Sequence, residues 1–214
     1  MNASRKRMRS LGVVIVLACA SFLVFSVSAN LKNPTKNPSQ RGSGTGGFAL
    51  LGESTLPVLH DLNTQEGQET FGVDEAILKN TSFVQLRVRE GGDASCLNLN
   101  RVSRARLLGV SSKALEKREA FSFLSTMEQR QNPWSLLRKK LPNGNIPAIA
   151  DQGTLQWGLN KKIGDTIEYV DENGEPFKIQ FIGSLKSSLL QGSVFIGEGA
   201  FMEKFPAVEG YRIL

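Results

Sequence analysis

The longest apolar run of the chain lies near its N-terminus, from Leu11 to Ala29, and it contains no charged residue. About 20 apolar residues in helical form cross the hydrocarbon core of a membrane. Four basic residues between positions 5 and 9 precede the run, and the positive-inside rule keeps such a flank in the cytoplasm. The pattern therefore predicts a cytoplasmic segment over residues 1–10, a transmembrane helix over residues 11–29, and an extracytoplasmic location for the residues that follow.

Two kinds of processing compete with a permanent anchor. Val27, Ser28 and Ala29 fit the small-residue site at which a secretory signal peptide is cleaved. The segment that ends at Cys19 loosely fits a bacterial lipoprotein box, although the apolar run continues past that cysteine. Because the run is longer than the roughly 7–15 residues of a usual signal-peptide core, an uncleaved helix is the favoured interpretation.

Residues 30–47 interrupt the hydrophobic pattern. They contain two Asn-Pro pairs and the stretch Arg41-Gly-Ser-Gly-Thr-Gly-Gly47. Such a composition buries little apolar surface and disfavours helix. We interpret the segment as a linker beside the membrane, and we expect the folded domain to occupy residues 48–214.

Strand-like patterns dominate the first half of this domain. Residues 81–89 place Val84, Leu86 and Val88 on one face and polar side chains on the other, which is typical of a half-buried strand. Shorter apolar segments predict further strands at 48–51, 96–99 and 107–110.

Helical patterns follow from Ser112. A stretch rich in Lys, Glu and Ala predicts a helix over residues 112–124. Asn132 and Pro133 supply a cap and a first-turn proline for a second helix. The apolar face of this second helix consists of Trp134, Leu137 and Leu141.

The last third alternates strands and helices. Residues 146–150 predict a strand, after which Asp151 caps a helix that ends before Gly164. Residues 166–170 and 177–182 flank an Asn-Gly pair, which predicts a β-hairpin. The remaining elements are a strand at 194–196, a short helix near 198–205 and a strand at 211–214. The fold class is α+β, and an alternative stays open in which residues 111–145 make most of a second subdomain.

Charge placement changes the picture that the formal charge of +6 suggests. Seven basic and no acidic residues precede Glu53, whereas the rest of the chain holds 19 basic and 20 acidic residues. A nucleic-acid-binding domain needs a basic face on its folded part, so we expect no nucleic-acid partner. The two cysteines, Cys19 and Cys96, lie on opposite sides of the membrane boundary, and no intramolecular disulfide is expected.

Two side chains could carry chemistry. His60, the single histidine, lies beside Asp61 and suggests a Ser-His-Asp arrangement with Ser54, but the chain has no nucleophile elbow. A surface or capping histidine is the preferred interpretation. Cys96 lies in a strand pattern, where a buried small hydrophobe is commoner than a reactive thiol.

Binding motifs are weaker still. The glycines at 42, 44 and 47 satisfy G-x-G-x-x-G without a preceding strand or a following helix, and no P-loop occurs. We expect the acidic cluster Asp171, Glu172 and Glu175 to be a solvated hairpin tip. Metal-ligand spacing is also missing. The sequence therefore predicts no enzyme and no catalytic, cofactor-binding or metal-binding residue.

The last third of the chain combines a strand, a helix, a Gly-containing turn before a strand, and a strand that ends in Gly. These motifs are Ile146–Asp151, Leu155–Asn160, Lys162-Ile-Gly-Asp-Thr-Ile167 and Lys178-Ile-Gln-Phe-Ile-Gly183. Ser43–Phe48 and Gly92–Asn100 also look like stretches of long bacterial permeases. Over most of its length the chain resembles the extracytoplasmic domain of FtsX-like, MacB-type ABC transporter permeases.

The resemblance implies a MacB-like periplasmic domain that follows the first helix of a bacterial inner-membrane permease and precedes three more helices. It implies a separate ABC ATPase subunit that binds ATP, a second permease copy or half, and a lipoprotein, peptide or protein partner outside the membrane. Export, lipoprotein release or mechanical signalling would be the role. Since Leu214 lies about where a second membrane helix should begin, we expect a fragment or a split gene. The alternative is a free-standing anchored or secreted binding protein.

Overall fold

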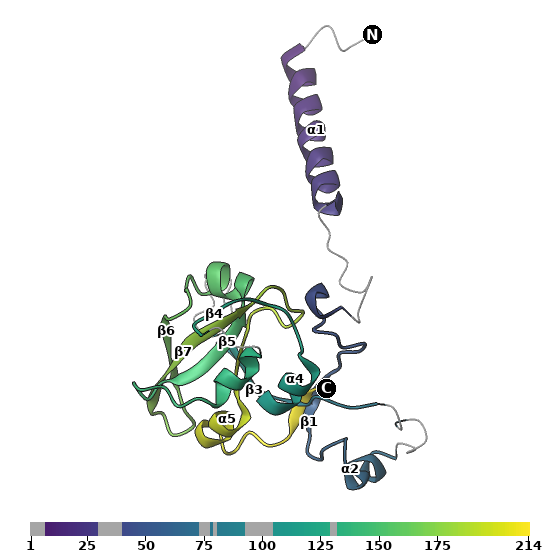
Figure 1. Ribbon diagram of the computed structural model, residues 1–214. Coiled ribbons are helices and arrows are strands. Elements are labelled where there is room, and N and C mark those ends of the chain that lie inside the picture. The colour runs from purple at the N-terminus through teal and green to yellow at the C-terminus, as the bar shows by residue number, and fades with distance from the viewer. Residues whose placement is uncertain (1–6, 30–39, 73–77, 79–80, 93–104, 129–131) are drawn as a thin grey trace. The chain divides into compact units, whose positions relative to one another are not determined.

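The computed structural model describes residues 7–29, 40–72, 78, 81–92, 105–128 and 132–214. Contacts divide the chain into two units, residues 1–36 and residues 37–214. The first unit holds the continuous helix α1, Arg7–Ala29 (Figure 1). Among the described residues, α1 is the one helix long and apolar enough to cross a membrane, over Met8–Ala29. Its length and composition suit a membrane span or a signal sequence.

The second unit is built on one nine-stranded sheet. The strands lie in the order β1-β9-β2-β3-β8-β5-β7-β4, and β6 pairs with β7. Neighbours are antiparallel except for the parallel pairs β3–β8 and β5–β7. The strands are β1 (Glu53–Val58), β2 (Leu86–Arg89), β3 (Arg106–Val110), β4 (Phe123–Thr126), β5 (Ile146–Asp151), β6 (Thr166–Val170), β7 (Pro176–Leu185), β8 (Ser193–Gly197) and β9 (Tyr211–Ile213). With its helices this sheet confirms the α+β class.

Short helical segments accompany the sheet. They are η2 (Arg41–Ser43), α2 (Gln65–Thr70), α4 (Ser112–Arg118), η3 (Pro133–Arg138), η4 (Thr154–Gly158) and α5 (Glu198–Lys204). Successive side chains of a strand point to opposite faces, so Leu107 and Leu108 of β3 belong to different apolar clusters. The Trp134 cluster packs α4 and η3 on one face, and the Phe201 cluster packs α5 and η4 on the other.

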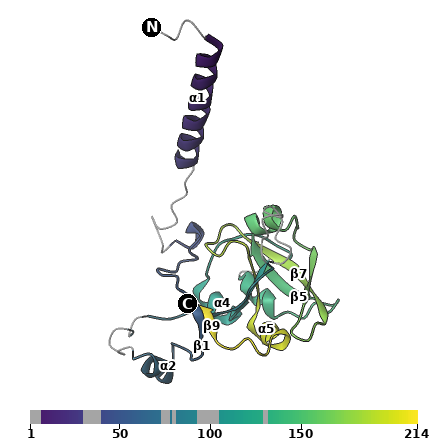
Figure 2. The ribbon, with the colours of Figure 1, turned by 180° about the vertical axis from the view of Figure 1, so that it is seen from behind.

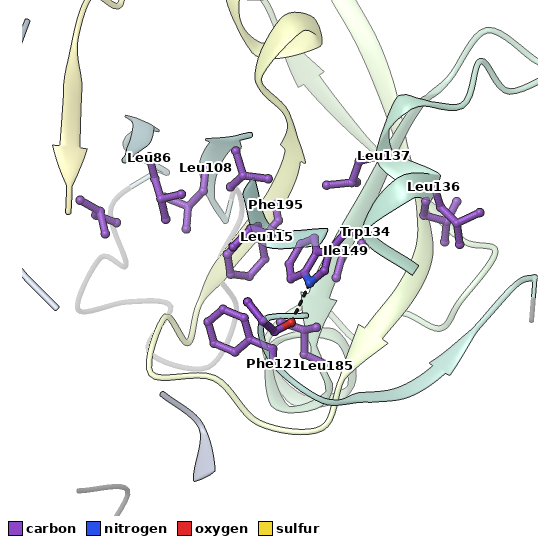
Figure 3. Packing of buried hydrophobic residues seen from close by; sticks show 14 of the residues in the cluster. Leu86, Leu108, Leu115, Phe121, Trp134, Leu136, Leu137, Ile149, Leu185 and Phe195 are labelled. Atoms are coloured by element: carbon purple, nitrogen blue, oxygen red, sulfur yellow. Dashed lines mark hydrogen bonds between the residues drawn. The ribbon is translucent and has the colours of Figure 1, made fainter. Parts of the chain in front are cut away.

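Trp134 lies fully buried at the centre of its cluster, as the close-up in Figure 3 shows. Its indole Nε1 donates a hydrogen bond of 2.7 Å to the carbonyl oxygen of Ala120. Its ring packs edge-on against Phe123 and Phe195, with centroid distances of 5.3 and 5.8 Å. One residue of η3 therefore ties together the chain after α4, strand β4 and strand β8.

The first and last strands of the second unit, among the described residues, lie together. Gly52 and Leu214 exchange two backbone hydrogen bonds of 3.0 and 2.9 Å, which continues the antiparallel pairing of β1 with β9. Figure 2 likewise shows the C-terminus beside β1 and β9. Gly44 to Gly46 are buried, and the Gly44 carbonyl accepts a hydrogen bond of 2.9 Å from Leu189 N–H.

Most predicted elements of the last third are confirmed. The hairpin is β6–β7, and Gly174 takes the left-handed conformation, with φ 87°, that its turn requires. The strands predicted at 107–110, 146–150, 194–196 and 211–214 correspond to β3, β5, β8 and β9, and the helix near 198–205 corresponds to α5.

The helix predicted over residues 112–124 is wrong in its second half. α4 ends at Arg118, and Phe123–Thr126 forms strand β4, which pairs with β7. The chain turns because Glu119 and Phe121 have positive φ angles of 48° and 63°. Non-glycine residues rarely adopt that region, so helical composition gave no sign of it.

Other expected elements are shorter than predicted or differ in kind. No strand forms over 48–51, since the ladder begins at β1, and within the described residues 81–92 only Leu86–Arg89 is strand. Asn132 caps Trp134 N–H as predicted, but the helix is a 3₁₀ segment that ends at Arg138. The helix expected after Asp151 is the single π-helical turn η4. The strand expected at 96–99 lies outside the described residues.

Candidate functional site

A groove opens where two parallel strands end side by side. β3 and β8 finish at the paired residues Val110 and Gly197. The chain continues from β3 into α4, which packs in the Trp134 cluster, and from β8 into α5, which packs in the Phe201 cluster. Adjacent parallel strands whose continuations leave toward opposite faces create a crevice beyond their carboxyl ends, where ligands bind in open α/β sheets. The topology thus marks this edge as the candidate site.

The groove has a volume of about 880 Å³, within the range of roughly 300–1,000 Å³ that is usual for ligand sites. Its walls come from the start of α4, the end of η3 with the loop to β5, the start of β7, and α5. Apolar side chains contribute to the lining, among them Leu141, Ile146, Pro147 and Phe177.

Two glycines let the walls approach closely. A Cβ atom on Gly197 would lie 3.1 Å from the carbonyl oxygen of Leu137, so this glycine brings β8 against η3. A Cβ atom on Gly109 would lie 2.6 Å from Cγ of Phe201, so that glycine admits the ring of α5 onto β3. Gly197 and Leu137, and likewise Gly109 and Phe201, lie far apart in the sequence, so no local sequence motif indicates the groove.

The charged lining is mostly basic. Two acidic side chains, Glu198 and Glu203, face six basic ones. The basic residues are Lys113, Arg138, Lys139, Lys140, Lys178 and Lys204. Since the chain after position 52 is almost neutral, this gathering is a local feature and not an overall excess of positive charge.

Ion pairs neutralise half of these cations. Arg138 pairs with Glu116 at 2.7 Å, Lys139 pairs with Glu128, and Lys204 lies 3.8 Å from Asp171. Within the described part of the chain, Lys113, Lys140 and Lys178 form no ion pair. All three are exposed. These lysines leave the groove with uncompensated positive charge.

A polar network holds the groove residue Glu198 in place. Glu198 accepts hydrogen bonds of 3.1 Å from Arg87 Nε and 3.2 Å from the Tyr211 hydroxyl. The Arg87 guanidinium lies 4.8 Å from the Tyr211 ring centroid and also donates to the carbonyl of Val208. Burial, and then the negative charge of Glu198, raise the pKa of Tyr211 above its ordinary value of 10.0. The network joins β2, α5 and β9.

The three residues of the possible Ser-His-Asp arrangement, Ser54, His60 and Asp61, make other interactions. Ser54 Oγ donates to the carbonyl of Leu56 at 2.6 Å, and His60 Nδ1 lies 4.0 Å from a Glu66 carboxylate oxygen. Asp61 Oδ1 accepts the backbone N–H of Asn63, in a turn. None of the described hydrogen bonds joins Ser54, His60 and Asp61 to one another.

The acidic cluster of the β6–β7 turn stabilises local structure, and neither cysteine is among the described residues that line the groove. Asp171 Oδ1 accepts two backbone N–H groups of the β6–β7 turn, and Glu172 accepts the N–H of Ala207. Cys19 is exposed on α1, and Cys96 lies outside the described residues. Over the described ranges, no group of three or more His, Cys, Asp or Glu side chains could hold a metal ion.

The basic groove itself was missed by sequence reasoning. Its lysines are scattered along the chain, and the pairing of β3 with β8, of β8 with β5 and of β5 with β7 brings them together. In comparisons with known proteins, no protein-family model matches the chain, and no curated protein matches it.

Proposed function

We propose that the chain is the membrane-anchored extracytoplasmic part of an FtsX-like, MacB-type ABC transporter permease. In this proposal α1 spans the bacterial cell membrane with its N-terminus in the cytoplasm, and residues 37–214 belong to the periplasmic domain. The chain catalyses nothing itself and works with a separate ATPase subunit and a second permease copy or half. Its role would lie in export, lipoprotein release or mechanical signalling.

One observation carries the proposal beyond the motifs of the sequence. A helix long and apolar enough to span a membrane precedes a unit whose first and last strands, β1 and β9, pair with each other. A helix of that length and composition ahead of a separately packed α+β unit is the arrangement expected of the first permease helix and its extracytoplasmic domain. The four basic residues before the apolar run Leu11–Ala29 favour the required orientation.

The test is purification of the tagged chain, in its native full-length context, from bacterial membranes. The expected result is an intact N-terminus in the membrane fraction and co-purification of an ABC ATPase subunit, identified by mass spectrometry. A matched control replaces residues 1–29 with a cleavable signal peptide, which should release the domain in soluble form without the ATPase. A native mature chain that begins at Asn30, or one that never associates with an ATPase, would favour a free-standing binding protein instead.

A further inference from the structure

We propose that the groove beyond β3 and β8 binds an extended acidic segment of a partner protein through spaced carboxylates. This inference rests on the groove and does not depend on the transport role. Its starting point is the crevice that the divergence of α4 and α5 creates, together with the three lysines that form no ion pair with any residue that the structure describes.

The positions of these lysines favour an extended ligand. Lys113 lies on α4, Lys140 follows η3, and Lys178 lies on β7, so the charges come from three separate walls. A compact ion would contact few of them at once. Between them lie apolar groups such as Ile146 and Phe177, which can accept the uncharged side chains of a peptide. Charge complementarity gives such a complex its specificity and speeds its formation.

The kind of cation suits a ligand that carries single, separated negative charges. The two-pronged guanidinium of arginine can hold one carboxylate or one phosphate through two parallel hydrogen bonds, whereas a lysine ammonium acts as a single point charge. Among the described residues that line the groove, Arg138 is the one arginine, and both of its terminal nitrogens are engaged, with the Ser112 hydroxyl at 3.1 Å and the Glu116 carboxylate at 2.7 Å. The remaining available charges are lysine ammonium groups, which act as point charges and suit carboxylates spaced along a chain.

The acidic lining is consistent with this assignment. Glu198 is held by Arg87 and Tyr211, so its charge is compensated within the protein. Glu203 is exposed and makes no ion pair among the described residues. It would repel an acidic ligand at the α5 end, which directs the ligand toward the side of the groove that carries Lys113 and Lys140.

The test measures fluorescence anisotropy of a short labelled peptide with glutamates spaced by leucine and serine, added to the full chain in detergent. The triple variant Lys113→Gln, Lys140→Gln, Lys178→Gln should weaken binding at least about fivefold, because three ion pairs are lost at once. The matched variant Lys117→Gln, Lys162→Gln, Lys186→Gln removes the same charge from exposed positions outside the groove and should change binding less than about twofold.

Two controls keep the proposal falsifiable. A peptide with glutamine in place of glutamate should not bind, and circular dichroism should show that both triple variants are folded. The proposal is overturned if the acidic peptide does not bind, or if both triple variants weaken it equally. It is also overturned if inorganic pyrophosphate displaces the peptide at an equal concentration, since the site would then prefer phosphate. None of these outcomes depends on whether an ATPase co-purifies, so the two proposals can fail separately.

Discussion

The two faces of the sheet are closed in different ways. On one face a single side chain, Trp134, joins several segments through ring contacts and one buried hydrogen bond. On the other face the packing is shared by a row of rings, Phe201, Phe205, Phe177 and Tyr169, with neighbouring centroids 5.4 to 6.0 Å apart. The stability of the first face should therefore depend most on one large side chain. The stability of the second face should be lowered most by a substitution that adds atoms where the packing is tightest.

Truncation of Trp134 should have the largest effect. Trp134→Ala leaves a cavity and should lower the free energy of unfolding by about 3–5 kcal/mol. It also leaves the Ala120 carbonyl without its partner, so the cost should lie in the upper part of that range. Urea unfolding followed by circular dichroism, on the full chain in detergent, measures the change.

Phe205→Ala is the matched truncation on the second face. Phe205 is equally well buried, but its ring makes no hydrogen bond, so the cost should lie in the lower part of the same range. An equal or larger loss for Phe205→Ala would contradict the contrast between the two faces.

Addition of one methyl group should be the next largest effect. Gly109→Ala places a Cβ atom 2.6 Å from the Phe201 ring and should cost about 1–3 kcal/mol, as overpacking usually does. Gly199→Ala in α5 is the control, since nothing lies within 4 Å of its Cβ position. That substitution should be neutral or slightly stabilising, by up to about 1 kcal/mol, because alanine favours helix. Equal losses for both would mean that the contact with Phe201 is not tight.

The smallest expected effect is on the pH dependence of stability, through Tyr211 of β9. The raised pKa of Tyr211 means that unfolding releases its proton between the ordinary value of 10.0 and the higher folded value. The stabilising contribution is complete below pH 10.0 and decreases as the pH rises above it. Tyr211→Phe should therefore lose less stability than the unchanged chain between neutral and strongly alkaline pH. Unfolding curves across that range, with tyrosinate absorbance as a second readout, test this, and equal slopes would refute it.

The same contrast explains what the sequence could predict. The second face uses contiguous elements with local signals, such as the Asn-Gly turn of the β6–β7 hairpin and the short helix α5, and both were predicted. The first face depends on left-handed conformations of Glu119 and Phe121, and the carbonyl between them, that of Ala120, accepts a hydrogen bond from the distant Trp134. Tertiary contacts of this kind override helix propensity, which is why the predicted helix over 112–124 continued too far.

The candidate site was unpredictable for a related reason. Lys113, Lys140 and Lys178 belong to no motif, and their proximity arises from strand order alone. The sequence did predict the helix that carries Lys113 and the strand that carries Lys178, but it did not predict which strands are neighbours. His60 beside Asp61 is a recognisable local pattern that suggests catalysis. In the structure, however, Asp61 accepts a hydrogen bond that stabilises a turn.

The pairing of Gly52 with Leu214 has a mechanical consequence. β1 and β9 run antiparallel, so backbone tension applied at these two residues would pull both strands from the same end of their ladder. In that geometry the hydrogen bonds break one after another instead of sharing the load, and the resisting force is small. The β1–β9 edge would then open before the β3–β8 and β5–β7 pairs at the centre of the sheet, which would protect both packed faces from the pull.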